Sequence, residues 1–456
     1  MQSRSGGVNI FDESRPMWRL FLVFLIPLVL SNALQSASQT ISSIFLGRLL
    51  GVHALAAVSA IFPLIFLLIS FMIGLASGST VLIGQAHGAK NLPTMRRVAG
   101  TTVCASFALG VVVAVLGIIF THPLLRLVGT PADIINDAAV YARIVFIYLP
   151  AFFPYIAYTT FLRGTGDSKT PFYFLIVSTV LVAIFTPWLI LGWFGLPRSG
   201  IAGAAIAGYI ANAVAFLALL IYLHRRRHEL QFTLDMIGVD WKLLATIVRI
   251  GVPAGVQTIL VALAEIAVIS FVNRFGSDAT AAYGAVNQIV GYVQFPAISI
   301  GITASIFGAQ SIGAHRHDKL NSVVRSGVML NYAIGGLIVL VCYVFAWDIL
   351  GWFITHPRPL GIAHELLMIT LWSYLIFGNS AVLSGVMRSS GTVFWPMVIG
   401  VFSIWGVEVP CAYVLMHHFG ISGIWMGYPI AFAVGLSLQF LYYEAFWKKK
   451  THQRLI

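Results

Sequence analysis

Residues 53–82 read HALAAVSAIFPLIFLLISFMIGLASGSTVL, a stretch that holds no Asp, Glu, Lys or Arg. About 20 apolar residues are enough for a helix to cross the hydrocarbon core of a bilayer, and this stretch is longer. It is also too long and too uniformly apolar for a strand of a membrane barrel, in which apolar and polar residues alternate. The stretch therefore predicts a membrane-spanning α-helix, because a helix satisfies its own backbone hydrogen bonds in lipid.

Eleven further stretches have the same character, so the sequence predicts an all-α integral membrane protein with twelve transmembrane helices. The composition agrees, with 59% hydrophobic and 9% charged residues, whereas soluble domains carry roughly 25% charged residues. The mean hydropathy of +0.91 also indicates a chain whose main solvent is lipid. The twelve candidate spans are 18–43, 53–82, 98–120, 138–160, 171–194, 201–223, 244–272, 279–307, 324–350, 363–386, 394–416 and 421–444.

Lys and Arg lie mainly on one side of these spans, in short clusters that run from Arg4 to Arg454. The exceptions are Arg143, inside the fourth span, and five residues on the other side: Arg48, Arg126, Arg198, Arg274 and Arg358. The positive-inside rule places the basic side in the cytoplasm. We therefore expect both termini to be cytoplasmic, in a bacterial-type cytoplasmic (inner) membrane. Topology also explains the net charge of +12, so nucleic-acid binding is not expected.

The two halves of the chain share short motifs at a nearly constant spacing. The spacing is 225 or 226 residues for three pairs: Gln85 and Gln310, Arg163 and Arg388, and Pro27 and Pro253. Six helices in each half give the repeats the same orientation, as in transporters whose two lobes are related by an axis along the membrane normal. We expect an N-terminal six-helix lobe (1–223), a cytoplasmic linker (224–243) and a C-terminal six-helix lobe (244–456), with alternating access between the lobes.

Several stretches resemble a known family. They are FLIPLVLSNALQ (24–35), FLGRLLG (45–51), IGQAHGAKN (83–91), FLRGTGDSKTPF (161–172), GIAGAAIAGYIAN (200–212), GVPAGVQT (251–258), AAYGAVNQIV (281–290) and SIFGAQSIGAHR (305–316). Together they are similar to the multidrug and toxic compound extrusion (MATE) exporters, over essentially the whole chain. The resemblance implies two six-helix bundles arranged as a V. It also implies secondary active antiport, in which organic, often cationic compounds leave as Na⁺ or H⁺ enters.

The sequence departs from the family pattern at the cation sites. Many members carry an aspartate just before the FxGR segment of the first helix, where Ser42 stands here. Those members also carry an Asn and an Asp, four residues apart, where Val182 and Thr186 precede Pro187. An acid that another branch carries in the seventh helix is replaced by Val261. We therefore expect the first-lobe cation site of such members to be absent.

Glu265 and Glu408 are the two carboxylates that lie well inside apolar stretches. A charge at the bilayer centre costs about 2.5–3.5 kcal/mol on insertion scales, so such residues usually face a cavity and act there. Either carboxylate could exchange a proton near neutral pH, because desolvation favours its neutral form. Alternatively, the pair could hold Na⁺ with help from Asn287, Gln288 or Tyr292, since Na⁺, like other hard cations, prefers oxygen ligands. A third interpretation is that each glutamate only hydrogen-bonds a neighbouring helix.

Asn32, Gln35 and Gln39 lie on one face of the first span, at positions i, i+3 and i+7. Polar side chains of this kind commonly join membrane helices by hydrogen bonds. The other interpretation is that Gln35 and Gln39 line a cavity for the cation or the substrate. The sequence leaves both open.

A lipid-linked precursor flippase is the main alternative function, and a channel is the next. A flippase would need a cluster of cavity arginines for a phosphate headgroup. Arg143 is the one arginine that the charge pattern assigns to neither side of the membrane, and we expect it to snorkel to the outer interface. A channel would need a filter-like loop or a ring of charges, and the sequence has neither.

No motif indicates an enzyme, and no P-loop is present that would bind ATP. The three cysteines, Cys104, Cys342 and Cys411, lie in apolar runs without metal-ligand spacing. We therefore expect no metal site and no cofactor other than the coupling ion, H⁺ or Na⁺. The expected partners are small organic substrates and the lipid bilayer, and a monomer is expected.

Overall fold

The computed structural model describes residues 7–192, 198–233 and 236–456, so Arg4 lies outside the described chain. Within these residues the secondary structure is helical and contains no β-strand. The helices of the first half are α1 (Met17–Leu50), α2 (Val52–Gly88), α3 (Leu92–Ile119), α4 (Thr121–Leu127), α5 (Ile135–Gly164), α6 (Lys169–Leu191) and α7 (Gly200–Arg225). Those of the second half are α8 (Trp241–Asn273), α9 (Ser277–Gly313), α10 (Asp318–Leu330), η3 (Asn331–Gly335), α11 (Gly336–Val344), α12 (Ala346–Gly351), α13 (Pro357–Thr370), α14 (Ser373–Ser389), α15 (Phe394–Val401), η4 (Phe402–Glu408), α16 (Val409–Phe419), α17 (Ile421–Tyr442) and η5 (Tyr443–Trp447).

Eleven helical segments in the described chain are long and apolar enough to cross a membrane, and the bent pair α13 and α14 makes a twelfth. The prediction of an all-α membrane protein with twelve spans is therefore confirmed. Several helices extend beyond the apolar runs that predicted them. For example, α2 continues past the expected end at 82 to Gly88. Hydropathy marks only the part of a helix that lies in hydrocarbon, and the helix can continue through the headgroup region.

The tenth span, expected as one run at 363–386, is bent by 44° between α13 and α14. The neighbouring span supplies hydrogen bonds at the break. The Tyr343 hydroxyl donates to the Met368 carbonyl and accepts the Trp372 amide, each at 3.1 Å. Broken membrane helices need such partners because lipid offers none to the freed backbone groups. The partner lies on another helix, so the run 363–386 alone does not predict the bend.

Three spans of the described chain contain π-helical turns, η3, η4 and η5. Such turns widen the helix locally and are frequent at functional sites. Asn331, the first residue of η3, donates to the Leu375 carbonyl at 2.8 Å and to the side chain of Asn379 at 3.0 Å. It thereby ties the ninth span to α14 just beyond the bend. Glu408 is the last residue of η4.

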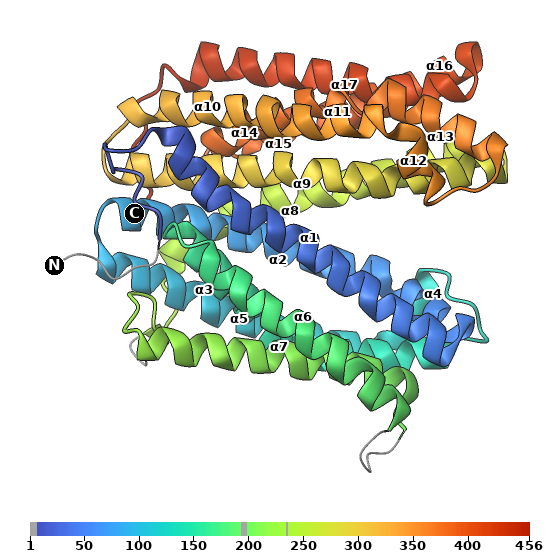
Figure 1. Ribbon diagram of the computed structural model, residues 1–456. Helices are drawn as coiled ribbons and strands as arrows, with labels where there is room; N and C mark the ends of the chain where they lie inside the picture. Colours follow the sequence, from blue (N-terminus) through green and yellow to red (C-terminus); the bar gives the residue numbers. More distant parts are fainter. Residues whose placement is uncertain (1–6, 193–197, 234–235) are drawn as a thin grey trace.

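The two lobes lie side by side, and each contains part of the other. Figure 1 shows α2–α7 on one side, the helices from α9 onward on the other, and α1 running diagonally between them. Phe21 and Phe24 of α1 belong to the core formed with α9, α10 and α14, with ring centroids 5.4 and 5.5 Å from that of Phe307. Leu243 and Ile247 of α8 pack in the core of the first lobe. Each lobe therefore takes in part of the first helix of the other.

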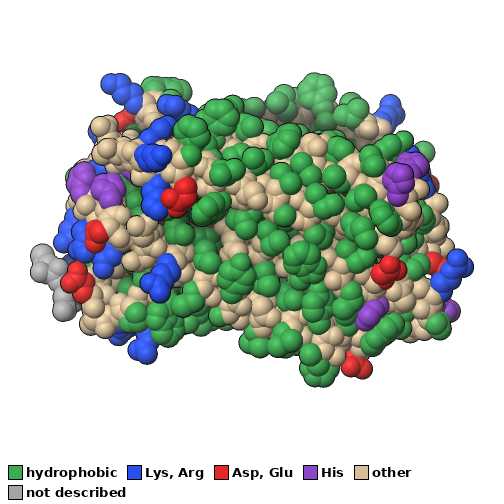
Figure 2. All heavy atoms as spheres, turned by 90° about the horizontal axis from the view of Figure 1, so that it is seen from above, with side chains coloured by type: hydrophobic (Ala, Val, Ile, Leu, Met, Phe, Trp, Pro, Cys, Tyr) green, Lys and Arg blue, Asp and Glu red, His purple; other side chains and the backbone are tan. Residues whose placement is uncertain are grey.

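An apolar band covers the middle of the molecule, and the charged and His side chains gather at its two ends (Figure 2). Side chains of this band such as Ile119 and Leu340 are well exposed, which suits contact with lipid tails. The described chain begins and ends at the same end of the bundle (Figure 1), here called the termini end. The other end is called the opposite end.

Candidate functional site

Glu265 on α8 lies in a cluster of hydroxyl groups. Its Oε2 accepts a hydrogen bond from the Tyr283 hydroxyl at 2.6 Å and another from the Tyr428 hydroxyl at 3.2 Å. The two tyrosine oxygens are themselves 3.0 Å apart. Three helices, α8, α9 and α17, therefore converge on one carboxylate. Hydroxyl donors offset the cost of taking a carboxylate out of water, which explains how this half-buried acid is held within the bundle.

Aromatic packing positions the hydroxyl groups of this cluster. Tyr283 is stacked on Trp425, with ring centroids 5.8 Å apart and an interplanar angle of 12°. Tyr283 and Tyr428 are both buried in the core of the second lobe at the opposite end. Because their rings are held by apolar neighbours, their hydroxyl groups have little freedom to turn away from Glu265.

Glu408 is the second predicted coupling residue, and it is 3% exposed. Its charge lies close enough to that of Glu265 for the two to interact, and both interact with Tyr374 of α14. Within the described chain its carboxylate makes no hydrogen bond. Trp405 Nε1 donates to the Leu260 carbonyl at 2.9 Å, which fixes η4 against α8. The structure therefore brings the two predicted glutamates into one region, one hydroxyl-bonded and the other without a partner.

The other predicted cavity residues are less closely grouped. Asn287 contacts the Tyr283 hydroxyl and so belongs to the Glu265 cluster. Gln288 and Tyr292 are exposed side chains on α9. Gln35 and Gln39 are exposed on α1, and within the described chain neither makes a hydrogen bond. The role of all five residues in binding stays a prediction.

Sequence reasoning missed Tyr283, Tyr374 and Tyr428. The available signal was spacing: Tyr283 precedes Asn287 by four residues, which places the two on one helix face. Asn32, by contrast, joins the lobes as one interpretation anticipated, since its Nδ2 donates to Ser299 Oγ at 3.0 Å.

In the described part of the first lobe, the position equivalent to Glu265 holds no carboxylate. Gln39 follows Pro27 at the same distance at which Glu265 follows Pro253, so an amide takes the place of the carboxylate. Ser42, which stands where many relatives have an aspartate, donates to the Ser38 carbonyl of its own helix at 3.1 Å. The two carboxylates that lie well inside apolar stretches are therefore both in the second lobe.

At the termini end the two lobes are joined by a pair of symmetry-related hydrogen bonds. Gln85 Nε2 of α2 donates to the Ser389 carbonyl of α14, and Gln310 Nε2 of α9 donates to the Gly164 carbonyl of α5, each at 2.8 Å. Gln85 and Gln310 are equivalent in the repeat, and so are Gly164 and Ser389. Each lobe thus binds the end of a helix in the other, and we call this pair of contacts the seal.

Two glycines permit the seal. A Cβ atom on Gly88 would lie 2.0 Å from the Gln310 carbonyl oxygen, and one on Gly313 would lie 2.0 Å from the Gln85 carbonyl oxygen. The backbones of α2 and α9 are therefore in direct contact at their ends. Only glycine fits at such a close approach, so the repeated Gln-x-x-Gly motif has a structural explanation.

The RGTGDSKTP motif lies next to the seal. Asp167 accepts the amides of Lys169 and Thr170 at 3.1 and 3.0 Å and so caps the start of α6. Ser168 Oγ donates to the Phe24 carbonyl of α1 at 2.7 Å. The Val8 amide donates to the Gly166 carbonyl at 2.9 Å. The motif therefore connects α6, α1 and the N-terminal segment.

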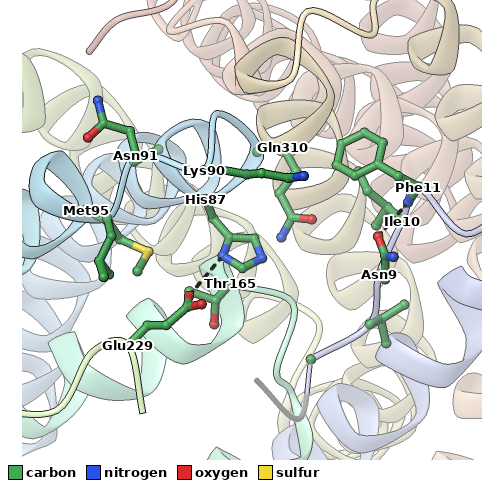
Figure 3. Close-up of a pocket in the computed structure, with 15 residues that line it drawn as sticks. Asn9, Ile10, Phe11, His87, Lys90, Asn91, Met95, Thr165, Glu229 and Gln310 are labelled. Carbon is green, nitrogen blue, oxygen red and sulfur yellow. Dashed lines mark hydrogen bonds and ion pairs between the residues drawn. The ribbon is translucent and has the colours of Figure 1, made fainter. Parts of the chain in front are cut away.

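A cavity of about 410 Å³ lies against the seal, between the N-terminal segment, the end of α2 and the linker that precedes α8 (Figure 3). His87 Nδ1 and a Glu229 carboxylate oxygen face each other at 3.7 Å. The polar contact with the His87 imidazole is the main reason why the pKa of Glu229 lies below its ordinary value, against the opposing effect of burial. Within the described residues no group of three or more His, Cys, Asp or Glu side chains could hold a metal.

The C-terminal tail (448–456) also reaches the seal. The Leu455 amide donates to Gln85 Oε1 at 2.8 Å, and Leu455 and Ile456 pack against the core of the first lobe. The tail leaves the second lobe at η5, where Trp447 Nε1 donates to Ser390 Oγ at 2.8 Å. The tail therefore runs from the second lobe to the first, and it ends against the Gln85 side chain of the seal.

Comparison with known proteins agrees with this architecture. A family model described as MatE matches residues 27–188 and again residues 253–414, which supports the internal repeat. The chain is 56% identical over 450 residues to the probable multidrug resistance protein YoeA of Bacillus subtilis (strain 168), covering 97% of each chain. It is 29% identical over 435 residues to the probable multidrug resistance protein YpnP of the same organism, covering 95% of this chain and 96% of that protein.

Solved structures share the fold. An outward-facing conformation of a multidrug resistance MATE family transporter matches with a TM-score of 0.89 at 20% identity, covering 98% of both chains. The Vibrio cholerae MATE transporter VcmN in the bent form matches with a TM-score of 0.86 at 21% identity, covering 94% of this chain and 96% of that one. The double family match and the 56% identical relative together show that this chain belongs to the MatE (MATE) family of multidrug transporters and is not an enzyme.

Proposed function

We propose that the chain is a secondary active exporter that antiports organic, often cationic compounds against H⁺ or Na⁺ by alternating access. The observation that carries this proposal is the Glu265 cluster, a carboxylate held by two tyrosine hydroxyl groups within a membrane-spanning bundle. Ionisable residues in such positions commonly mark ion pathways. The names of the relatives, which are multidrug resistance proteins, support the substrate class.

Glu265 and Glu408 have different roles in this proposal. Glu265 is bound by hydroxyl groups that can also serve as oxygen ligands, so it forms the fixed part of a cation site. Glu408 is buried, lacks a hydrogen-bond partner in the described chain and sits beside the charge of Glu265. Two nearby carboxylates repel each other unless a proton or a cation joins them. The pair therefore binds one positive charge and releases it when the lobes rearrange.

Alternating access requires the lobes to separate at one end at a time. The seal joins the lobes at the termini end. The positive-inside rule places that end in the cytoplasm, with both termini inside a bacterial-type cytoplasmic membrane. The described state is then closed towards the cytoplasm. Export requires the seal to break so that the substrate can enter between the lobes from that side.

The test uses inside-out vesicles that contain the whole chain, with substrate uptake driven first by a proton gradient and then by a sodium gradient. Glu265→Gln and Glu408→Gln keep the side-chain size and remove the charge. Glu365→Gln is the matched control, because Glu365 is exposed at the opposite end and, among the described residues, bonds only Ser422. We expect the first two variants to insert normally and lose gradient-driven uptake, and the control to keep it.

If both variants transport at the unmutated level, the coupling site lies elsewhere. The gradient that drives the unmutated protein identifies the ion. The flippase alternative gains no support from the geometry. Arg143, which the sequence places inside the fourth span and on neither side of the membrane, is exposed and lies 3.5 Å from His122 of α4.

A further inference from the structure

A second cavity at the termini end, of about 330 Å³, is formed by the start of α10 and the C-terminal tail. His317 and Asn321 come from the α10 side, and Lys450 and His452 come from the tail. The cavity lies away from the Glu265 cluster and plays no part in the proposed coupling. It lies where the last span emerges from the apolar band, and Lys, Arg and His side chains gather at this end (Figure 2).

Four of the side chains that line this cavity are basic, His317, Lys448, Lys450 and His452, and no carboxylate is among the described residues of the lining. Lys448 is paired with Glu444 at 3.0 Å. The side chains of Lys450 and His317 have neither a hydrogen bond nor an ion pair within the described chain. Burial lowers the pKa of His452, and the charges of His317 and Lys450 lower it further. Three basic groups therefore face the same space without an anion between them.

Aromatic rings fix one wall of the cavity. Trp447 is stacked on His452 with centroids 4.0 Å apart and on Tyr443 at 5.2 Å. Trp and Tyr are typical of the depth at which lipid headgroups lie. The run Lys448, Lys449 and Lys450 directly follows the last span, and such a basic cluster on the cytoplasmic side is the pattern that attracts anionic lipids.

We propose that this cavity binds a phosphate group, with Lys450, His317 and His452 as its donors. The phosphate belongs either to an anionic phospholipid headgroup or to free phosphate, since both present the same oxygens. The same tail continues to Leu455, whose amide bonds Gln85 in the seal. A phosphate bound between α10 and the tail holds the tail in this path, and so favours the state that is closed at the termini end.

The test uses the full chain in a neutral detergent at constant ionic strength, with the unfolding temperature as readout. A ligand that binds the folded state raises this temperature in a saturable manner. Short-chain phosphatidylglycerol and inorganic phosphate are titrated separately. We expect saturable stabilisation of the unmutated protein. Lys450→Gln should weaken the apparent affinity roughly tenfold, the size of one charge-assisted hydrogen bond, and Lys450→Arg should restore most of it.

Lys449→Gln is the matched control, because Lys449 is the neighbouring exposed lysine and does not line the cavity. We expect its affinity to stay within about twofold of the unmutated value, since it loses only screened attraction. Saturation by phosphatidylglycerol alone identifies a lipid, and equal saturation by inorganic phosphate identifies the free ion. Equal losses in Lys449→Gln and Lys450→Gln, or no saturation with either probe, would overturn the proposal.

Discussion

Gln85 and Gln310 occupy equivalent positions in the two repeats, and each donates its side-chain amide to a backbone carbonyl of the opposite lobe at 2.8 Å. The relationship is reciprocal, because the acceptors, Ser389 and Gly164, are equivalent as well. Gln85 is distinguished by one further bond, which it accepts from the Leu455 amide. Gln85 therefore makes two hydrogen bonds in the seal, whereas Gln310 makes one.

We expect Gln85→Ala to open the termini end. The substitution removes two hydrogen bonds between lobes, each worth about 1 kcal/mol, so the ratio of open to closed molecules should rise roughly tenfold or more. Double electron–electron resonance between spin labels on α3 and α10 at the termini end measures the ratio. Gln453→Ala, an exposed change on the same tail, is the control. Identical distance distributions in the two variants would contradict the assigned role of the seal.

Gly313→Ala should weaken the contact between α2 and α9. The new methyl group would lie 2.0 Å from the Gln85 carbonyl oxygen, and overpacking of this kind costs about 1–3 kcal/mol. Gly336→Ala is the matched control, since a Cβ atom there meets nothing within 4 Å. Unfolding in increasing concentrations of a denaturing detergent gives the comparison. If the Gly313→Ala protein were as stable as the control and its lobes stayed closed, α2 and α9 would not be in direct backbone contact at Gly313.

Tyr283→Phe should alter coupling while leaving the fold intact. The substitution removes the hydroxyl that bonds Glu265 at 2.6 Å, and it keeps the ring that stacks on Trp425. We expect gradient-driven uptake to fall about tenfold with a changed dependence on pH or Na⁺, since one charge-assisted hydrogen bond is lost. Tyr413→Phe, on the exposed face of α16, should behave like the unmutated protein. Equal uptake by both variants would remove Tyr283 from the site.

Asn331→Leu should destabilise the bent tenth span. It leaves the Leu375 carbonyl and the Asn379 side chain without their donor. Hydrogen bonds between membrane helices average about 0.6 kcal/mol and reach about 1.7 kcal/mol, so a loss of about 1–2 kcal/mol is expected for the two together. Asn136→Leu, at an exposed position at the start of α5, provides the control. The measurement is the free energy of unfolding in mixed micelles, and an unchanged value would show that the bend needs no support from η3.

We expect His228, in the segment between α7 and α8, to make the stability of the protein depend on pH. This side chain is buried, and its Nδ1 accepts the Leu230 amide at 3.1 Å. Burial lowers its pKa below the ordinary value of 6.5, although the charges of Asp167 and Glu229 oppose the shift. The unfolded chain therefore takes up a proton more readily than the folded chain. The contribution of His228 to the free energy of unfolding is therefore fully present above pH 6.5. It declines as the pH falls below that value.

His228→Asn should reduce this loss of stability in acid, because the Asn Oδ1 atom keeps an acceptor without a titrating ring. Thermal unfolding between pH 5 and 8 tests the expectation. His224→Asn serves as the control, since His224 is exposed at the end of α7. Parallel pH profiles for the unmutated protein and His228→Asn would assign the acid sensitivity to another group.

The sequence predicted the helices better than it predicted their contacts. A run such as 53–82 predicts a membrane-spanning helix, because backbone groups in lipid must form their hydrogen bonds within the helix. The bend after Thr370 was not predicted, because the groups that compensate it belong to a different span. The Gln85 and Gln310 motifs were found as a repeat. Their role depends on how two lobes are placed, and no local pattern contains that information.

The candidate site shows the same division. Glu265 and Glu408 were identifiable because a carboxylate in a membrane span is costly and rare. Tyr283 and Tyr428 gave no such signal, since tyrosine is common in apolar helices. These two tyrosines belong to the site because their hydroxyl groups donate to Glu265 on another helix. Whether these residues couple transport stays a prediction that the vesicle experiment tests.

The exchange of α1 and α8 between the lobes has a consequence for how the protein is made. Phe21 and Phe24 are synthesised first, yet their packing partner Phe307 is added only after the entire first half and α8. During biosynthesis this face of α1 must remain against lipid or the insertion machinery until α9 arrives. Conversely, the first lobe completes its core only when Leu243 and Ile247 of α8 have been inserted. A half-chain that ends before α8 should therefore enter the membrane but remain a target for quality-control proteases.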